Sequence, residues 1–275
     1  MKCALLLVAS LLLLVLGPDN PDLDVVKWGD KECGLEGNPN GSEAQKDLDR
    51  HKNRYEAPGD EDFDPQVSLP AMLAPGNDVK RFDPEKAAKI IGFVVNVKSG
   101  GKESCNCDAT DPDAWDTHIE LGLAGDVEKT QRVIVEVTPR LRMLKKKAGE
   151  NWTTDELRTK LKGKWVEVTG WLLFDTVHIK QAENTAPGNP TNFRATCWEV
   201  HPVTEIKPLD GPPAELASFQ PASLTALQRQ HAKHIENAPN GKKSVTKLNN
   251  AQLAKFSTKE KQDAQEEAAA RFKEP

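Results

Sequence analysis

The sequence predicts a mainly β protein whose compact part, residues 79–208, is a small five-stranded Greek-key barrel. Two observations lead to this prediction. β-branched and aromatic residues gather in five short runs separated by turn residues, as in small barrels. The apolar fraction is only 37% and the mean hydropathy is -0.59. Much of the 275-residue chain is therefore expected to lie outside the core.

The five runs are assigned as strands in chain order. Residues 87–97 are rich in Ile and Val and end at a Ser-Gly-Gly turn, and residues 115–123 alternate between polar and apolar side chains. Residues 132–138 stop before Pro139. Two helical stretches, 141–147 and 154–161, precede the fourth and fifth runs at 164–174 and 193–206.

Three strands, a bridging helical region and two further strands are the order of the oligonucleotide/oligosaccharide-binding (OB) barrel. The longest predicted loops, 99–114 and 178–192, follow the first and fourth strands, as in that fold. We expect a ligand surface on the barrel face and these loops, because OB barrels use them. Another small barrel or sandwich is the competing fold.

The regions outside the barrel differ in composition. An apolar run at 4–16 behind Lys2 predicts a signal peptide over 1–17 and export to the periplasm or the extracellular space, with an uncleaved membrane anchor as the alternative. Residues 18–78 hold 15 acidic and 6 basic residues with seven prolines and predict a disordered acidic linker. Residues 209–275 predict a low-complexity tail, helix-prone at 223–236 and 251–272, and no membrane-spanning domain is expected after signal removal.

Several stretches of the core are similar to uncharacterised exported bacterial proteins with an OB-like barrel. They are DTHIEL at 116–121, VEVTP at 135–139, GWLLFD at 170–175, QAENT at 181–185 and ATCWEVHPVT at 195–204. The resemblance covers roughly residues 80–208. It implies an exported bacterial module and no particular reaction.

Four cysteines follow the signal stretch, at positions 33, 105, 107 and 197. An oxidising compartment would allow them to pair. Cys105 and Cys107 are too close in sequence for an ordinary bridge to each other. A disulfide from either of them to Cys197 is one expectation, and free buried thiols are the other.

Two matched patterns mark a candidate metal or polar site. Asp116-x-His118 and Glu199-x-His201 each place a carboxylate and an imidazole on one face of a strand. With His178 nearby they would suit zinc or another first-row metal, or a general base. The alternative is a polar network with a structural role only. A third strand separates the two strands that carry the patterns, which argues against one shared site. No cofactor is expected beyond this possible divalent metal.

Basic and aromatic side chains form a second candidate surface. Five cationic residues, Arg140, Arg142, Lys145, Lys146 and Lys147, follow the third strand and precede the helical stretch 154–161, and Arg194 is the second residue of the fifth run. Trp115, Trp152 or Trp171 would supply stacking planes. Residues 79–208 hold 20 basic and 19 acidic residues, a balance that does not favour nucleic acid.

These observations favour an exported, non-catalytic binding module for a polymer or protein of the cell envelope. A metal-dependent hydrolase of phosphodiesters or similar esters, using the Asp/His/Glu/His pattern, is the alternative. A structural protein that makes its contacts through the tails is a third, weaker hypothesis. The chain has no Gly-rich phosphate loop, Gly-x-Ser-x-Gly elbow or His-Glu-x-x-His motif, so the common hydrolase and nucleotide-binding classes lose support.

Overall fold

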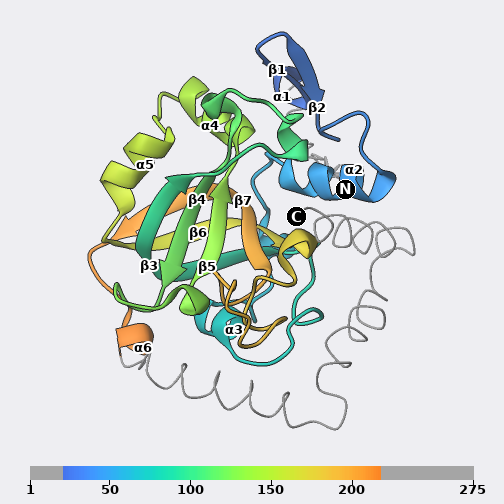
Figure 1. Cartoon of the computed structure of the whole chain (residues 1–275). Helices are drawn as coiled ribbons and strands as arrows, with labels where there is room; N and C mark the ends of the chain where they lie inside the picture. Colours follow the sequence, from blue (N-terminus) through green and yellow to red (C-terminus); the bar gives the residue numbers. More distant parts are fainter. Residues whose placement is uncertain (1–20, 218–275) are drawn as a thin grey trace, which may run out of the picture.

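The computed structural model describes residues 21–217, and a closed five-stranded barrel is its centre (Figure 1). Its strands are β3 (Ala87–Ser99), β4 (Thr117–Gly122), β5 (Val133–Val137), β6 (Trp165–Phe174) and β7 (Trp198–Leu209). Their order is β3-β4-β5-β7-β6. β5 and β7 run parallel and the other neighbours antiparallel. This topology confirms the predicted OB-like barrel.

Alternation along the strands produces the barrel core. Val133, Val135 and Val137 of β5 belong to the main core cluster, as the two-residue period of a strand requires. Trp198, at the start of β7, is fully buried in edge-to-face contact with Phe174, and its indole Nε1 donates a hydrogen bond to the backbone of residue 78. β7 begins five residues later than predicted, because residues 193–197 belong to the second long loop, in which Arg194 forms an isolated bridge with Ala182.

Two helices connect β5 to β6, at the two stretches predicted to be helical, namely α4 (Pro139–Lys147) and α5 (Thr154–Leu161). α4 begins at Pro139. A proline is favourable at this first helical position, because the backbone N–H that it lacks would have no partner within the helix. The side chain of Thr138 caps the helix by accepting a hydrogen bond from the backbone N–H of Leu141. Proline therefore ends the strand, as predicted, and also starts the helix.

The prediction of a disordered linker over 18–78 is wrong for the residues that the structure describes. Residues 21–78 form ordered structure that packs on the barrel, with Leu23, Leu69, Met72 and Leu73 fully buried in its core. Its elements are α1 (Pro21–Asp24), β1 (Val25–Trp28), β2 (Lys31–Gly34), α2 (Glu43–Lys52), η1 (Asp60–Asp62) and α3 (Leu69–Leu73). Isolated apolar residues among many acids and prolines supply these contacts. Their spacing follows neither the helical nor the strand period, so the sequence does not reveal them.

A disulfide fastens this N-terminal segment to the first long loop. Cys33 of β2 is bonded to Cys107, and the two lie 74 positions apart. Cys105 and Cys197 are free and buried. The predicted bridge to Cys197 is therefore wrong, because Cys197 lies in the barrel core while Cys107 faces the β1–β2 hairpin.

The remaining elements are short. The first long loop, residues 100–116, contains η2 (Ser104–Asn106) and η3 (Pro112–Ala114), and the second, residues 175–197, contains η5 (Thr176–His178); η4 (Lys129–Gln131) and α6 (Ala214–Ala217) complete the set. Among residues 21–217, no helix is long and apolar enough to cross a bilayer. The predicted signal peptide and most of the predicted tail lie outside the described residues.

Candidate functional site

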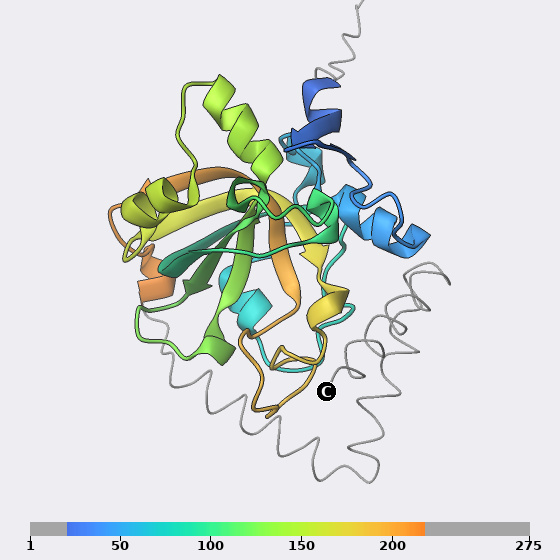
Figure 2. The ribbon, with the colours of Figure 1, turned by 45° about the horizontal axis from the view of Figure 1, so that its top comes forward.

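The chain covers part of its own barrel surface. α2 contacts both β7 and η2, on one side of the barrel (Figures 1 and 2). At the end of α2, the Nζ atom of Lys52 lies 2.8 Å from Oε2 of Glu103 in the first long loop. All five residues of β5 are buried, including Ile134 and Glu136, which alternate to the outer face. This part of the face is thus closed to an external ligand, contrary to the expected use of the barrel face.

Histidines and carboxylates gather beneath this cover in a group that we call the histidine–carboxylate cluster: Asp116, His118, Glu136, Glu199 and His201. The Nε2 atom of His201 lies 3.3 Å from Oδ2 of Asp116, and its Nδ1 atom lies 3.2 Å from Oε2 of Glu199. Oε2 of Glu136 lies 3.4 Å from Nδ1 of His201 and 3.3 Å from Nε2 of His118. Glu136 therefore joins the two predicted patterns.

An ionic chain extends the cluster into the second long loop. Nη1 of Arg194 lies 2.6 Å from Oε1 of Glu199 and 3.2 Å from Oδ2 of Asp175. Asp175 also contacts Nδ1 of His178. All five predicted candidates, Asp116, His118, His178, Glu199 and His201, thus belong to one connected network, although His178 lies at its far end.

The network holds protons on its histidines. Burial alone would lower the pKa of His201 and His118, but nearby carboxylates, Glu136 first among them, raise these pKa values to about 10 and about 9. Burial also raises the pKa of Glu136, to about 8, against the opposing effect of His118. All three shifts have the same sign, so the folded cluster retains protons that an unfolded chain would release.

The pKa values of two carboxylates at the other end of the network are lowered rather than raised. Burial would raise the pKa of Asp175, but the contact with His178 holds it well below its ordinary value. Burial would likewise raise the pKa of Glu199, and Arg194 lowers it. The guanidinium of Arg194 is 1% exposed and serves as a counter-ion inside the protein.

Sequence reasoning missed the residue that connects the patterns. Glu136 is the one acid within the apolar run 132–138, and it is the cross-strand partner of His118. An acid at an alternating position of a predicted central strand was the available signal. Glu103, which lies 3.7 Å from His118, comes from the first long loop, and no pattern in the sequence places it there.

The predicted basic surface divides into buried and exposed parts. Arg140 is fully buried and donates hydrogen bonds to the backbone carbonyls of Cys33 and Gly34, so it anchors the β1–β2 hairpin. With the equally buried Arg194, it is removed from the candidate ligand surface. The indole Nε1 of Trp115 bonds within the first long loop, to the carbonyl of Ala109.

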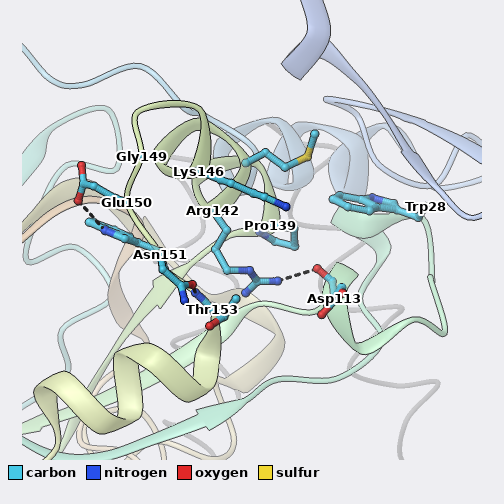
Figure 3. A pocket seen from close by; sticks show the side chains of 11 residues that line it. Trp28, Asp113, Pro139, Arg142, Lys146, Gly149, Glu150, Asn151 and Thr153 are labelled. Carbon is cyan, nitrogen blue, oxygen red and sulfur yellow. Dashed lines mark hydrogen bonds between the residues drawn. The ribbon is translucent and has the colours of Figure 1, made fainter.

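Other members of that surface meet at a pocket of about 550 Å³ (Figure 3). It lies between the β1–β2 hairpin, α4 and the first long loop. Its lining residues are Trp28, Asp113, Pro139, Arg142, Met143, Lys146, Gly149, Glu150, Asn151, Trp152 and Thr153. Arg142 and Lys146 were predicted as ligand residues, and Trp152 as a stacking plane. The side chains of Lys145 and Lys147 engage Trp152 and Asp22 instead.

Arg142 is held rigidly at the floor of this pocket. Its guanidinium donates hydrogen bonds to Oγ1 of Thr117 and to the backbone carbonyls of Asp113 and Trp115. Opposite, the indole Nε1 of Trp152 donates to the carboxylate of Glu150. The pocket therefore has preformed walls, and its exposed cation, Lys146, forms no ion pair with any residue that the structure describes.

Comparisons with known proteins give the chain no family. No family model matches it, and no curated protein matches it. Among solved structures, it is similar to the asparaginyl-tRNA synthetase of Entamoeba histolytica, with 14% sequence identity and a TM-score of 0.25. That match covers 63% of this chain and 31% of the synthetase chain, so the chain spans about a third of its length.

Proposed function

We propose that this protein is an exported, non-catalytic binding module, and that its ligand site is the pocket between the β1–β2 hairpin, α4 and the first long loop. The observation that carries this proposal is the pocket itself. Its volume of about 550 Å³ lies within the range of small-ligand sites. Tryptophans from two separate segments, Trp28 and Trp152, line it together with charged groups of both signs.

The lining favours one sugar unit of an envelope or extracellular glycan as the occupant. The half-buried ring of Trp28 offers flat apolar surface, whereas Trp152 is 7% exposed, has Lys145 over its ring and contributes only part of the wall. Aromatic side chains of this kind line many small-ligand sites. Lys146, Glu150 and Asn151 add donors and acceptors at the rim. Mixed charge suits a hydroxyl-rich ligand better than a nucleic-acid backbone, which would require a predominantly basic surface.

Burial argues against the hydrolase alternative. Asp116 and His201 are fully buried, and Glu199 is 1% exposed. A substrate ester would have to displace α2 and the first long loop to reach these groups. The pocket, in contrast, needs no such movement.

Export is supported by the cysteines as well as by the apolar N-terminal run. The Cys33–Cys107 disulfide joins the β1–β2 hairpin to the first long loop. Such bonds persist in oxidising compartments and are rare in the cytosol. The disulfide thus supports the proposed location in the periplasm or outside the cell.

A binding screen tests the proposal. The full chain is titrated with soluble envelope and extracellular oligosaccharides by calorimetry and tryptophan fluorescence. Trp28→Ala and Lys146→Ala should each weaken binding of any hit at least about tenfold, which corresponds to about 1.4 kcal/mol. The matched control is Lys162→Ala, a charge removal outside the pocket, which should leave the affinity unchanged.

Two results would contradict the proposal. One is a hit whose affinity is insensitive to both pocket variants. The other is hydrolysis of a phosphodiester or similar ester of an added ligand, detected by mass spectrometry and abolished by Glu199→Gln, which would establish the hydrolase instead.

A further inference from the structure

Two carboxylates and one imidazole meet at the edge of the histidine–carboxylate cluster, and none of the three residues lines the pocket. His118 of β4 and Glu136 of β5 are direct cross-strand partners. Glu103 comes from the first long loop, one residue before η2. The fold thus brings one ligand-type side chain from each of three separate segments to the same place.

The distances between these atoms match a metal coordination shell. Nε2 of His118 lies 3.3 Å from Oε2 of Glu136 and 3.7 Å from Oε1 of Glu103. Nitrogen and oxygen ligands lie about 2.0–2.2 Å from a tetrahedral zinc ion, which places them roughly 3.4 Å from one another. Ligand atoms of all three residues lie within 4.8 Å of one another, a spacing that one shared ion would require.

Two of these atoms are buried and without a hydrogen bond. Nε2 of His118 and Oε2 of Glu136 are shielded from solvent and face each other at 3.3 Å, but within residues 21–217 no contact of either atom has the geometry of a hydrogen bond. Glu136 is 4% exposed. Buried polar atoms normally have a partner, so this pair needs an explanation. A cation between them satisfies both lone pairs.

Neighbouring groups orient the ligands. Lys52 occupies the other oxygen of Glu103 at 2.8 Å, which directs Oε1 toward His118. A Cβ atom at Gly100 would lie 2.8 Å from Nε2 of His118, so the glycine leaves room beside the nitrogen. The side chains of His118 and Glu103 are 20% and 21% exposed and provide an entry path.

We propose that Glu103, His118 and Glu136 bind one divalent first-row transition-metal ion, zinc by preference, with water as the fourth ligand. One imidazole and two carboxylates suit such an ion. The ion joins the first long loop to β4 and β5, beside the Cys33–Cys107 disulfide. Its role is to hold the loop over the barrel face, and it is independent of the pocket.

The rival explanation is a proton in place of the metal. A protonated His118 would pair with both carboxylates at the same distances. Metal binding to the folded protein separates the two, because a proton-held network has no need of a metal and shows no stoichiometric uptake.

The test is a titration of the full-length, chelator-treated protein with Co²⁺ and Zn²⁺. We expect visible absorption typical of four-coordinate cobalt at one equivalent, and its displacement by zinc. Glu103→Gln and His118→Gln should each weaken zinc binding at least ~100-fold, more than the loss of an outer-shell partner. His51→Gln, on α2, is the matched control and should bind as the wild type does.

Two further controls separate loss of the metal site from loss of the fold and from binding elsewhere in the chain. Circular dichroism of each variant establishes that it is folded, and Glu103→Gln, on a loop, serves if His118→Gln does not fold. His231 and His234 lie outside the described residues, so both are also changed to Gln, which should leave the titration unchanged. Folded wild-type protein that takes up neither ion, or binding that survives Glu103→Gln and His118→Gln, would overturn the proposal.

Discussion

Nε2 of His201 lies 3.3 Å from Oδ2 of Asp116, although the two residues come from strands that are not neighbours in the barrel. Asp116 directly precedes β4, and His201 lies within β7, with β5 between them. The side chains of Asp116 and His201 meet on the outer side of β5, where the first long loop covers them. Asn106 of that loop donates a hydrogen bond to Oδ1 of Asp116 at 2.9 Å.

Removing the buried guanidinium should destabilise the fold strongly. In Arg194→Met, the buried carboxylates of Asp175 and Glu199 lose the guanidinium that they share, and each keeps only the ion pair with its histidine. Breaking a buried pair on one side costs about 3–5 kcal/mol. We expect that loss in the free energy of unfolding, measured with urea. Lys162→Ala, at an exposed lysine, should change it by less than about 0.5 kcal/mol, and an equally small effect of Arg194→Met would show that the network contributes little.

Stability should fall as the pH rises above neutral. The folded pKa values of His118 and His201, about 9 and about 10, exceed their ordinary value of 6.5, and that of Glu136, about 8, exceeds 4.5. Their contribution is fully present below the unfolded values and is lost as the pH rises through the folded ones. Urea unfolding with a chelator at about pH 6 and about pH 9.5 should show the decrease.

A second pair of groups sets the acid limit. The lowered pKa values of Glu199 and Asp175 contribute stability that is present above their unfolded values and is lost as the pH falls. Maximum stability is therefore expected at mildly acidic pH. Unfolding free energy that rises steadily from pH 6 to about pH 9.5 would contradict the assigned proton positions, and His51→Gln should retain the wild-type profile.

The disulfide should account for a large part of the attachment of the N-terminal segment. Cys33 and Cys107 are 74 positions apart, and closing a loop of this length stabilises a chain by about 4 kcal/mol in the entropic model. Cys33→Ala should lower the free energy of unfolding by about this amount. Peptide mapping without reduction should recover Cys33 linked to Cys107. A linkage from Cys107 to Cys197 would show that the pairing is wrong.

The sequence predicted the barrel better than its surroundings. Alternating apolar residues and Pro139 identified the strands because each signal is local. The ordered state of residues 21–78 depends on single side chains such as Leu23 and Leu69, which become apolar contacts only when the barrel exists. The candidate site shows the same difference. Asp116-x-His118 and Glu199-x-His201 are local patterns that the sequence shows, whereas the position of Glu103 depends on how the first long loop folds.

The barrel predicted from sequence, residues 79–208, should not fold well on its own. Leu23, Leu69, Met72 and Leu73 are all fully buried in the main core, and each such side chain contributes about 1.5–3 kcal/mol. Their combined loss approaches the whole net stability of an ordinary domain, about 5–15 kcal/mol. We expect residues 21–217 to unfold cooperatively, and residues 79–208 to lack fixed near-ultraviolet circular dichroism and to bind a hydrophobic dye. Equal melting temperatures for the two fragments would mean that the N-terminal segment is an attachment to the barrel and no part of its core.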